Sequence, residues 1–410
     1  MRTLSIFFRA LVGMTLLSVA ISAHAQTVNT LYTFTGGANG ANPSGQLVAD
    51  GHGGFYGVTF EGGVVTSSCL NGCGTVFELT PNGSGGWTQT VIFSFSNETT
   101  TGHGPFNLVM DTHGNLFGTG VGGGQSQNAV CGASQGACGM VFEVSPGPNG
   151  WTEKVIHSFQ GFPHDGQYPN GNILIDASGN LYGTTNLGGI GTQRQCYGNG
   201  CGTVWEISPM PDGQWKEKTI YNFLGLTYGQ YPDGLTMDAA GNLYGATEYG
   251  GFLQRGTVFK LSPTKNGWIG GVVFRLGGDL GYFPAGIVQL DARGNIYLVA
   301  ESGSAANIVE VSPGASGWTA QVVASFPQQT IYLHGLTTDA QGNMYGTTTA
   351  TVYELEEVNG AMQIVTLATM DGANGSSPNL PIFDANGNLF GLNAVGTGAS
   401  VNGTFFEITQ

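Results

Sequence analysis

Residues 176–185 read DASGNLYGTT, and versions of this phrase recur along the whole chain of 410 residues. An Asp followed by x-x-Gly-Asn is typical of a tight turn, in which the carboxylate accepts backbone N–H bonds while Gly and Asn take positive φ. Self-similarity at such intervals predicts a repeat architecture. Seven copies, separated by 61, 65, 62, 53, 48 and 45 residues, begin at Asp50, Asp111, Asp176, Asp238, Asp291, Asp339 and Asp384.

Three further strand patterns recur at the same intervals as the phrase. Each unit therefore has four predicted strands, named A to D in chain order. A short apolar run before the Asp, such as 173–175, predicts strand A, and the Asn-Leu-Tyr part of the phrase predicts strand B. The pattern Gly-Thr-Val-Phe-Glu-Leu-Thr-Pro at 74–81 predicts strand C, and a run that starts with Trp, such as 151–159, predicts strand D. The connections are too short for parallel crossovers, so antiparallel meanders are expected.

Four-stranded units repeated at 45 to 65 residues are typical of a β-propeller. We therefore predict an all-β fold, a seven-bladed β-propeller of four-stranded antiparallel blades, in one domain over residues 26–410. Residues 27–34 follow a D pattern without a unit of their own, and residues 403–409 end the chain on a C pattern. These two segments are expected to pair, so that the N-terminal strand closes the ring on the C-terminal blade.

The composition supports this fold and narrows the partners. Gly accounts for 71 residues and charged side chains for only 9%, while Val, Ile, Thr and aromatic residues fill the positions between the glycines. Helices tolerate Gly poorly, whereas strands favour the other residues. The formal net charge is −15, and the 11 basic residues are scattered along the chain. Nucleic acids and anionic membranes are therefore not expected as partners, because both require clustered basic residues.

Residues 1–25 match a secretory signal peptide. Arg2 and Arg9 give a positive start, residues 10–21 are apolar, and Ala23-His24-Ala25 is a small-x-small cleavage site. The apolar run is shorter than the roughly 20 residues that cross a bilayer. We expect cleavage after residue 25, a mature chain with a net charge near −17 and no membrane span, and a secreted or periplasmic location.

The order of the patterns resembles a known family. A Gly-x-Gly-Thr-Val-Phe-x-Leu-x-Pro stretch, a strand of the Tyr-x-Phe type and Gly-x-x-Pro-x-x-x-Leu-x-x-Asp-x-x-Gly-Asn-Leu-Tyr-Gly-Thr-Thr follow one another, as in the Gloeo-Verruco (GloVer) tandem repeat of secreted bacterial "choice-of-anchor" proteins. The resemblance covers about residues 27–410 and is weaker in the fifth and sixth units, where Leu298 and Val299 replace Gly-Thr. It implies a repeat architecture and export, and it supplies no catalytic residues. Residues 403–410 follow a strand pattern, so no C-terminal anchor is expected.

The six Cys residues fall into three local pairs, each in the predicted B–C loop of one of the first three units. In an exported protein three local disulfides are the natural interpretation, although six Cys allow 15 connectivities. A thiolate metal site is the alternative, which the lack of a companion His in these loops disfavours. The pairs are Cys69 with Cys73, Cys131 with Cys138, and Cys196 with Cys201.

Residues that recur in every unit maintain the unit, so a functional site has to break the repetition. The stretch GASQG at 132–136 matches a nucleophile motif, but it lies in a Gly-rich loop rather than at a strand-to-helix turn. Asp384-x-Asn386-x-Asn388 resembles the start of a calcium loop without its later Gly and Glu. The chain has no zinc-protease, phosphate-loop or dinucleotide motif. We expect neither a metal nor a cofactor.

Irregular residues concentrate in the predicted D–A and B–C loops, which emerge on the same face of a propeller. Aromatic rings and single carboxylates around a central mouth can stack on sugar rings and accept their hydroxyl groups. Alternatively, the aromatic residues cap the blade ends and the carboxylates are solvated. Candidate ligand-face residues in the D–A loops are His103, Phe106, His164, Asp165, Tyr168, Tyr228, Tyr231, Asp233, Asp279, Tyr282, Phe283, Tyr332 and His334. Those in the B–C loops are Glu61, Arg194, Glu248, Arg255 and Glu301.

The sequence leaves two functions open and assigns no catalytic residue. The first is a non-catalytic exported propeller, expected to be a monomer, that presents this face to a carbohydrate or an envelope protein. Clustering of at least two carboxylates with a His in one pocket would favour the second. This alternative is a lyase or glycoside hydrolase with its site in the central mouth, drawing on Glu61, Glu248, Glu301, His103, His164 and His334.

Overall fold

The fold is all-β, as the Gly-rich and charge-poor composition predicts. The structure is a computed structural model that describes residues 26–67, 69–96, 101–124, 131, 138–191, 196, 198–303, 305–326, 333–372, 374–384, 386–395 and 402–409. Within these ranges strands are connected by turns and short 3-10 helices, and no α-helix occurs. The 3-10 helices are η1 (Gly37–Asn39), η3 (Leu226–Tyr228), η4 (Phe252–Gln254) and η5 (Gly278–Leu280). No helix in this described part of the chain is long and apolar enough to span a membrane.

The first four repeats form four separate antiparallel sheets of four strands each. The first sheet holds β2 (Ala41–Ala49), β3 (Phe55–Glu61), β4 (Thr75–Pro81) and β5 (Trp87–Ser94). The second holds β6 (His103–Met110), β7 (Leu116–Gly122), β8 (Met140–Gly147) and β9 (Gly150–Ser158). The third holds β10 (Gly166–Ile175), β11 (Leu181–Gly188), β12 (Thr203–Pro209) and β13 (Trp215–Asn222). The fourth holds β14 (Gln230–Met237), β15 (Leu243–Tyr249), β16 (Thr257–Thr264) and β17 (Gly267–Arg275).

The remaining repeats form two larger sheets. An eight-stranded sheet joins two antiparallel four-stranded runs through one parallel bridge between Ile287 and Gly335. Its first run holds β18 (Tyr282–Leu290), β19 (Ile296–Ser302), β20 (Ala305–Gly314) and β21 (Gly317–Ser325). Its second run holds β22 (Leu333–Thr338), β23 (Met344–Thr348), β24 (Thr351–Val358) and β25 (Ala361–Thr369). A five-stranded sheet holds β26 (Ser376–Pro378), β27 (Ile382–Phe383), β28 (Leu389–Val395), β29 (Thr404–Ile408) and β1 (Val28–Thr33).

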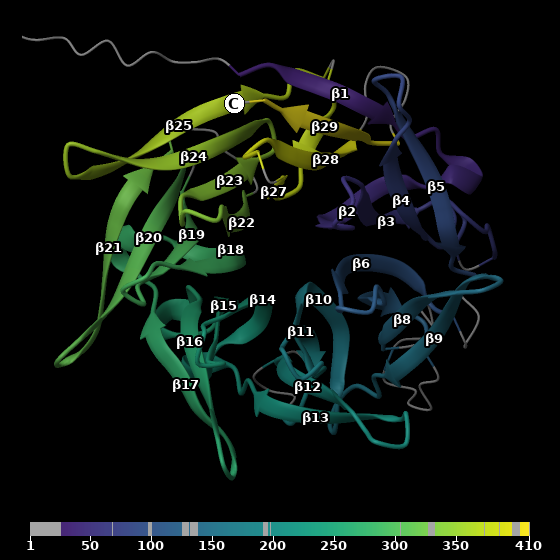
Figure 1. Ribbon diagram of the computed structural model, residues 1–410. Coiled ribbons are helices and arrows are strands. Elements are labelled where there is room, and N and C mark those ends of the chain that lie inside the picture. Colours follow the sequence, from purple (N-terminus) through teal and green to yellow (C-terminus); the bar gives the residue numbers. More distant parts are fainter. Residues whose placement is uncertain are drawn as a thin grey trace, which may run out of the picture.

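The N-terminal strand completes the five-stranded sheet. β1 pairs with β29 in antiparallel register, with Val28 opposite Ile408 and Thr33 opposite Thr404. Figure 1 shows the sheets side by side around a centre, with the first strand of each unit innermost and β1 beside β29. The predicted pairing between residues 27–34 and residues 403–409 is therefore confirmed.

The apolar core lies between neighbouring sheets. Phe95, which follows β5 of the first sheet, meets Phe142 of the second sheet edge-on at a centroid distance of 5.0 Å. The same arrangement occurs at the closure, where Phe34 meets Phe77 at 5.1 Å. All four side chains are fully buried. Burial of these aromatic side chains between sheets supplies much of the hydrophobic stabilisation of the fold.

A contact between Gly and Pro joins successive sheets. A Cβ atom on Gly74, which leads into β4, would collide with Pro105 Cδ in the next sheet. The recurring Gly of the C pattern and the recurring Pro that precedes the A pattern therefore pack against each other, which only a residue without a side chain allows. Equivalent contacts join Gly139 to Pro169, Gly202 to Pro232, Gly256 to Pro284 and Gly403 to Pro43.

The repeated phrase forms the turn between the first two strands of a unit. Asp176 Oδ1 accepts hydrogen bonds from the backbone N–H groups of Ser178 and Asn180 at 2.8 and 2.9 Å. Gly179 takes a φ of 81°. The predicted turn is confirmed, but the expectation that Asn also takes positive φ is wrong, because Asn180 already leads into the extended strand β11.

The innermost strands begin earlier than the apolar run before each Asp predicts. β14 begins at Gln230 and β22 at Leu333, so Tyr231, Asp233 and His334 lie on strands and not in D–A loops. Pro and Gly in these segments suggest a loop, but an innermost strand needs a partner on one side only and therefore tolerates Pro. A register shift beyond Asp233 then lets the strand resume its apolar alternation.

Candidate functional site

Residues of the innermost strands, together with Asn379 and Leu380 between β26 and β27, surround a central cavity of about 130 Å³. This volume is close to that of the engineered cavity of about 150 Å³ that holds benzene, so the space accepts a ring-sized group. Polar and apolar side chains share its wall. Those that matter for its chemistry are Gln46, Phe106, Asn107, Asp233, His334 and Asn379.

One position of the repeat that lines the cavity holds a different residue type in different units. Pro and Gly recur around one position of the innermost strand, as in Pro232-Asp233-Gly234, but the residue between them changes from unit to unit. Phe106, Asp233, His334 and Asn379 occupy this position and line the cavity. Because scaffold positions repeat and a site must differ, this position is the strongest candidate for function. Its seven occupants are Ser44, Phe106, Asn170, Asp233, Ala285, His334 and Asn379.

Asp233 and His334 are the titratable residues among those that line the cavity. Asp233 Oδ2 accepts a hydrogen bond from the Gly286 N–H at 3.1 Å. Burial raises the pKa of the Asp233 carboxyl despite this bond. Burial lowers the pKa of the His334 imidazole, whose buried Nε2 has no hydrogen-bond partner among the described residues. Desolvation therefore favours the neutral form of both groups.

An aromatic cluster lies where the innermost strands of the fourth and fifth units begin. Tyr249 meets Tyr231 and Phe283 at centroid distances of 5.6 and 4.7 Å. Phe283 meets Tyr282 at 4.8 Å, and the Arg255 guanidinium lies 5.7 Å from the centroid of the Tyr282 ring. All five side chains are partly exposed. We call these five residues the rim cluster.

Carboxylates accompany the rim cluster. Glu248 precedes Tyr249 on β15, and Glu301 of β19 lies opposite Tyr282 in the strand register. Burial raises the pKa of Glu248, and the negative charges of Asp233 and Glu301 raise it further. Glu248 therefore lies near both other carboxylates, and hydroxyl groups of a ligand can donate hydrogen bonds to it.

The comparison with protein families agrees with the motif order. The model of the Gloeobacter/Verrucomicrobia repeat matches residues 130–351, which is more than half of the chain. The chain belongs to the Gloeobacter/Verrucomicrobia repeat family. The resemblance to the GloVer repeat is thereby confirmed. Among curated proteins, no sequence matches this repeat protein.

Solved structures similar to the Gloeobacter/Verrucomicrobia repeat protein share its propeller-like fold at low identity. An ulvan lyase of a new polysaccharide lyase family, bound to -[GlcA(1-4)Rha3S]-, is 13% identical with a TM-score of 0.54, covering 93% of this chain and 96% of that one. A Bacteroides uniformis protein proposed to be a 6-phosphogluconolactonase is 14% identical with a TM-score of 0.51, covering 79% and 87%. The extracellular domain of a proposed hybrid two-component system from B. thetaiotaomicron is 14% identical with a TM-score of 0.51, covering 93% and 41%. These likenesses show the fold alone.

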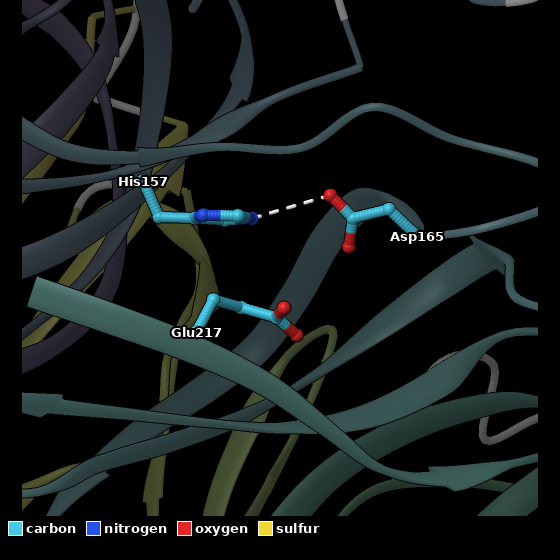
Figure 2. A group of neighbouring side chains, drawn as sticks. All are labelled: His157, Asp165 and Glu217. Atoms are coloured by element: carbon cyan, nitrogen blue, oxygen red, sulfur yellow. Dashed lines mark hydrogen bonds and ion pairs between the residues drawn. The ribbon is translucent and has the colours of Figure 1, made fainter.

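A second group of titratable side chains lies on the outer strands of the repeat protein. His157 of β9 and Asp165, in the turn before β10, are 3.2 Å apart between Nε2 and Oδ2. Glu217 of β13 joins them, and ligand atoms of all three lie within 4.8 Å of one another. Figure 2 shows the three side chains pointing toward one another. Burial and then the nearby Asp165 carboxylate raise the pKa of Glu217 to about 7. We call these three residues the outer cluster.

Those of the other predicted ligand-face residues that the structure describes do not line the central cavity. Glu61, at the end of β3, accepts a hydrogen bond from Asn71 Nδ2 at 3.1 Å. His103 begins β6, and His164 is exposed in the turn before β10. Tyr168 of β10 has a φ of 55° where the second and third sheets meet. Of the rest, Tyr228 lies in η3, Asp279 lies in η5, and Arg194 and Tyr332 lie outside the described residues.

The enzyme alternative expects Glu61, Glu248 or Glu301 in the central pocket. The described residues that line the cavity do not include these three carboxylates, which lie on the second strand of their units. Of the six residues that the alternative draws on, His334 lines the cavity, and the carboxylate beside it is Asp233.

Several residues escaped the sequence analysis. Asn107 links three sheets of the repeat protein, because its Oδ1 accepts from Gln46 N–H at 3.1 Å and its Nδ2 donates to the Gly171 carbonyl at 2.7 Å. Comparing the positions around the Pro of each unit would have found it. His157 and Glu217 lie in D patterns, which recur from unit to unit and are therefore attributed to the scaffold. Both side chains are polar at positions where the residue type differs between units, and this difference could have identified them.

The six cysteines of the repeat protein lie together in the three pairs that the sequence predicts. Each pair is in the loop between the second and third strands of its sheet, as expected. Such separations suit disulfide bonds, whose Cα atoms usually lie 4.4 to 6.8 Å apart. The Cα–Cα distances are 5.1 Å for Cys69 and Cys73, 5.1 Å for Cys131 and Cys138, and 5.2 Å for Cys196 and Cys201.

The second Cys of a pair belongs to the core between sheets. Cys73 and Cys138 lie in B–C loops but are only 1% and 0% exposed. Cys73 lies in the apolar cluster of the first and second sheets, and Cys138 lies in that of the second and third. The reason is that the next sheet packs onto these loops: Gly104 N–H donates to the Cys73 carbonyl at 2.9 Å, and Tyr168 N–H donates to the Cys138 carbonyl at 2.8 Å. Cys201 is equally buried, and its carbonyl accepts from Tyr231 N–H at 3.0 Å.

Proposed function

We propose that the chain is an exported seven-bladed β-propeller that binds a neutral saccharide at the rim cluster and the adjoining mouth of the central cavity. Counting the two runs of the eight-stranded sheet separately gives one blade for each copy of the repeated phrase. The signal-like residues 1–25, which lie outside the described residues, and the three Cys pairs support export.

The rim cluster carries this proposal. Partly exposed rings retain surface that can stack on the apolar face of a sugar, as Tyr and Phe do in many ligand sites. Glu248 and Glu301 can accept hydrogen bonds from sugar hydroxyl groups, and the Arg255 guanidinium can donate to ring and hydroxyl oxygens. The central cavity adds room for one ring-sized group between Phe106 and Asp233.

Charge selects a neutral saccharide over an acidic one. The whole chain has a formal net charge of −15, and the carboxylates of Glu248 and Glu301 accompany the Arg255 cation of the rim cluster. A polyanionic glycan would be repelled on approach, because the field of the protein acts on association as well as on contact.

Binding of neutral oligosaccharides tests the proposal. We expect a glycan array and then calorimetry to detect a neutral saccharide, and we expect Tyr249→Ala to weaken its binding about tenfold, which is ~1.4 kcal/mol. Tyr228→Ala is the matched control, because this exposed Tyr of η3 lies outside the rim cluster. Binding confined to acidic glycans, or an equal loss in both variants, would contradict the proposal.

A second candidate function is acid–base chemistry in the central cavity, and the two opposite pKa shifts favour it. A raised pKa keeps Asp233 nearer its acid form and a lowered pKa keeps His334 a neutral base, which is a division of roles that lyases and hydrolases use. Turnover of a bound saccharide that is lost in both Asp233→Asn and His334→Gln would establish it. Binding without turnover leaves the non-catalytic proposal standing.

The three Cys pairs are proposed to be disulfides in the exported protein. We expect intact-mass measurement to show a gain of six hydrogens on full reduction and no alkylation before it. Loops this short gain about 2 kcal/mol per bridge in the chain-entropy model, so the reduced protein should unfold at a lower temperature. Alkylation of six thiols in the untreated protein would refute the pairs and favour the thiolate metal site.

A further inference from the structure

The outer cluster brings together ligand atoms from three separate segments of the chain. His157 comes from the outermost strand of the second sheet, Asp165 from the turn between the second and third sheets, and Glu217 from the outermost strand of the third (Figure 2). Their nitrogen and oxygen atoms lie within 4.8 Å of one another. Metal–ligand bonds of about 2.0 to 2.2 Å would draw such atoms together through small side-chain rotations.

The two carboxylates are held in place by other groups, as the ligands of metal sites usually are. Asp165 is only 8% exposed. Its Oδ2 accepts from Gln160 N–H at 2.8 Å, and its Oδ1 accepts from Gly166 N–H at 2.6 Å. Thr219 donates its hydroxyl to Glu217 Oε1 at 3.2 Å. These bonds fix both carboxylates while leaving lone pairs that face His157.

Among the described residues, no Lys or Arg forms an ion pair with the carboxylates of the outer cluster. Within the described ranges the ion pairs are His113 with Asp111 and His157 with Asp165, and neither includes a Lys or Arg. Two carboxylates in a largely buried site are costly unless a cation compensates them. The imidazole of His157 beside them supplies a nitrogen ligand.

We propose that His157, Asp165 and Glu217 bind one divalent transition-metal ion, with Zn²⁺ the best fit, as a cross-link between the outer strands β9 and β13. An imidazole in the ligand set favours Zn²⁺ over Ca²⁺ and Mg²⁺, which prefer oxygen alone. Three protein ligands leave a fourth position for water in a tetrahedral site. This site differs from the thiolate site considered for the Cys pairs, and it runs against the absence of metal that the sequence predicts.

The repeat supplies a matched control. Glu153 of β9 lies opposite Val144 of β8, just as Glu217 of β13 lies opposite Ile207 of β12. Glu153 and Glu217 therefore occupy the same position in successive units. Burial raises the pKa of Glu153 to about 7, so it is also a partly buried acid. Within the described residues Glu153 belongs to no group of potential metal ligands.

Zinc titration of the purified, tag-free protein tests the proposal. We expect calorimetry and metal analysis after dialysis to give one Zn²⁺ per chain, with a higher unfolding temperature in ZnCl₂ than in MgCl₂ or CaCl₂. Glu217→Gln and His157→Gln should each weaken zinc binding at least tenfold, whereas Glu153→Gln should leave it unchanged.

Two results would overturn the proposal. The first is a wild-type protein that takes up no zinc after chelator treatment. The second is uptake that Glu217→Gln and His157→Gln leave intact, which would assign the zinc to other groups such as the exposed His164. Unfolding curves in chelator, compared between wild type and variants, establish that weaker binding does not come from misfolding.

Discussion

Deletion of residues 28–34 is expected to abolish cooperative folding of the chain. The segment supplies β1, which pairs with β29, and Phe34, which is fully buried against Phe77 of the first sheet. Truncating one buried Phe costs about 3 to 5 kcal/mol. The deletion also exposes the β29 edge, and domains have only about 5 to 15 kcal/mol of total stability. Urea unfolding followed by Trp fluorescence measures the effect.

A rearranged chain is the control for this deletion. The antiparallel register places Val28 beside Ile408, so the segment 28–34 can follow residue 410 through a Gly-rich turn. That order restores the C-to-D hairpin of the other units, and we expect the rearranged chain to fold. If the deleted chain unfolds at the same urea concentration as the wild type, the ring does not depend on this closure.

The closure was predictable because it depends on recurrence alone. Residues 27–34 form a D pattern that belongs to no unit, and residues 403–409 form a C pattern that no D pattern follows. Pairing of these two segments completes the last unit. The turn at Asp176 was predictable for the same reason. The start of β14 was not, since Pro232 and Gly234 obscure a strand that pairs on one side only.

The candidate site was predictable in its residues and less so in its layout. Single-sequence patterns identified Tyr231, Phe283 and Asp233 as irregular, but the radial position of a side chain depends on which strand is innermost and where that strand starts. Asp165 is the clearest example of a residue whose position the sequence does not predict. The sequence groups it with the ligand face, whereas the packing of two outer strands places it with His157 and Glu217.

Trp205→Ala is expected to destabilise the protein by about 4 kcal/mol, near the middle of the range for truncating a large buried aromatic residue. Trp205 is fully buried between the second and third sheets, 5.9 Å from Phe159 between ring centroids. It lies opposite Gly183, where a Cβ atom would collide with the indole ring. No neighbour can therefore fill the cavity that the truncation leaves, and unfolding in urea measures the loss.

The matched variant Trp205→Phe separates packing from the indole N–H. Phe occupies the same position in four other units, at Phe77, Phe142, Phe259 and Phe406, each opposite a Gly. Trp205 Nε1 is buried without a hydrogen-bond partner among the described residues, a cost of about 1 to 3 kcal/mol that Phe removes. We expect that gain to offset most of the lost ring volume, so that Trp205→Phe changes stability by less than about 1.5 kcal/mol. A loss as large as that of Trp205→Ala would mean that the indole makes a contact specific to this unit, and the repeat could not then be treated as one interchangeable aromatic joint between sheets.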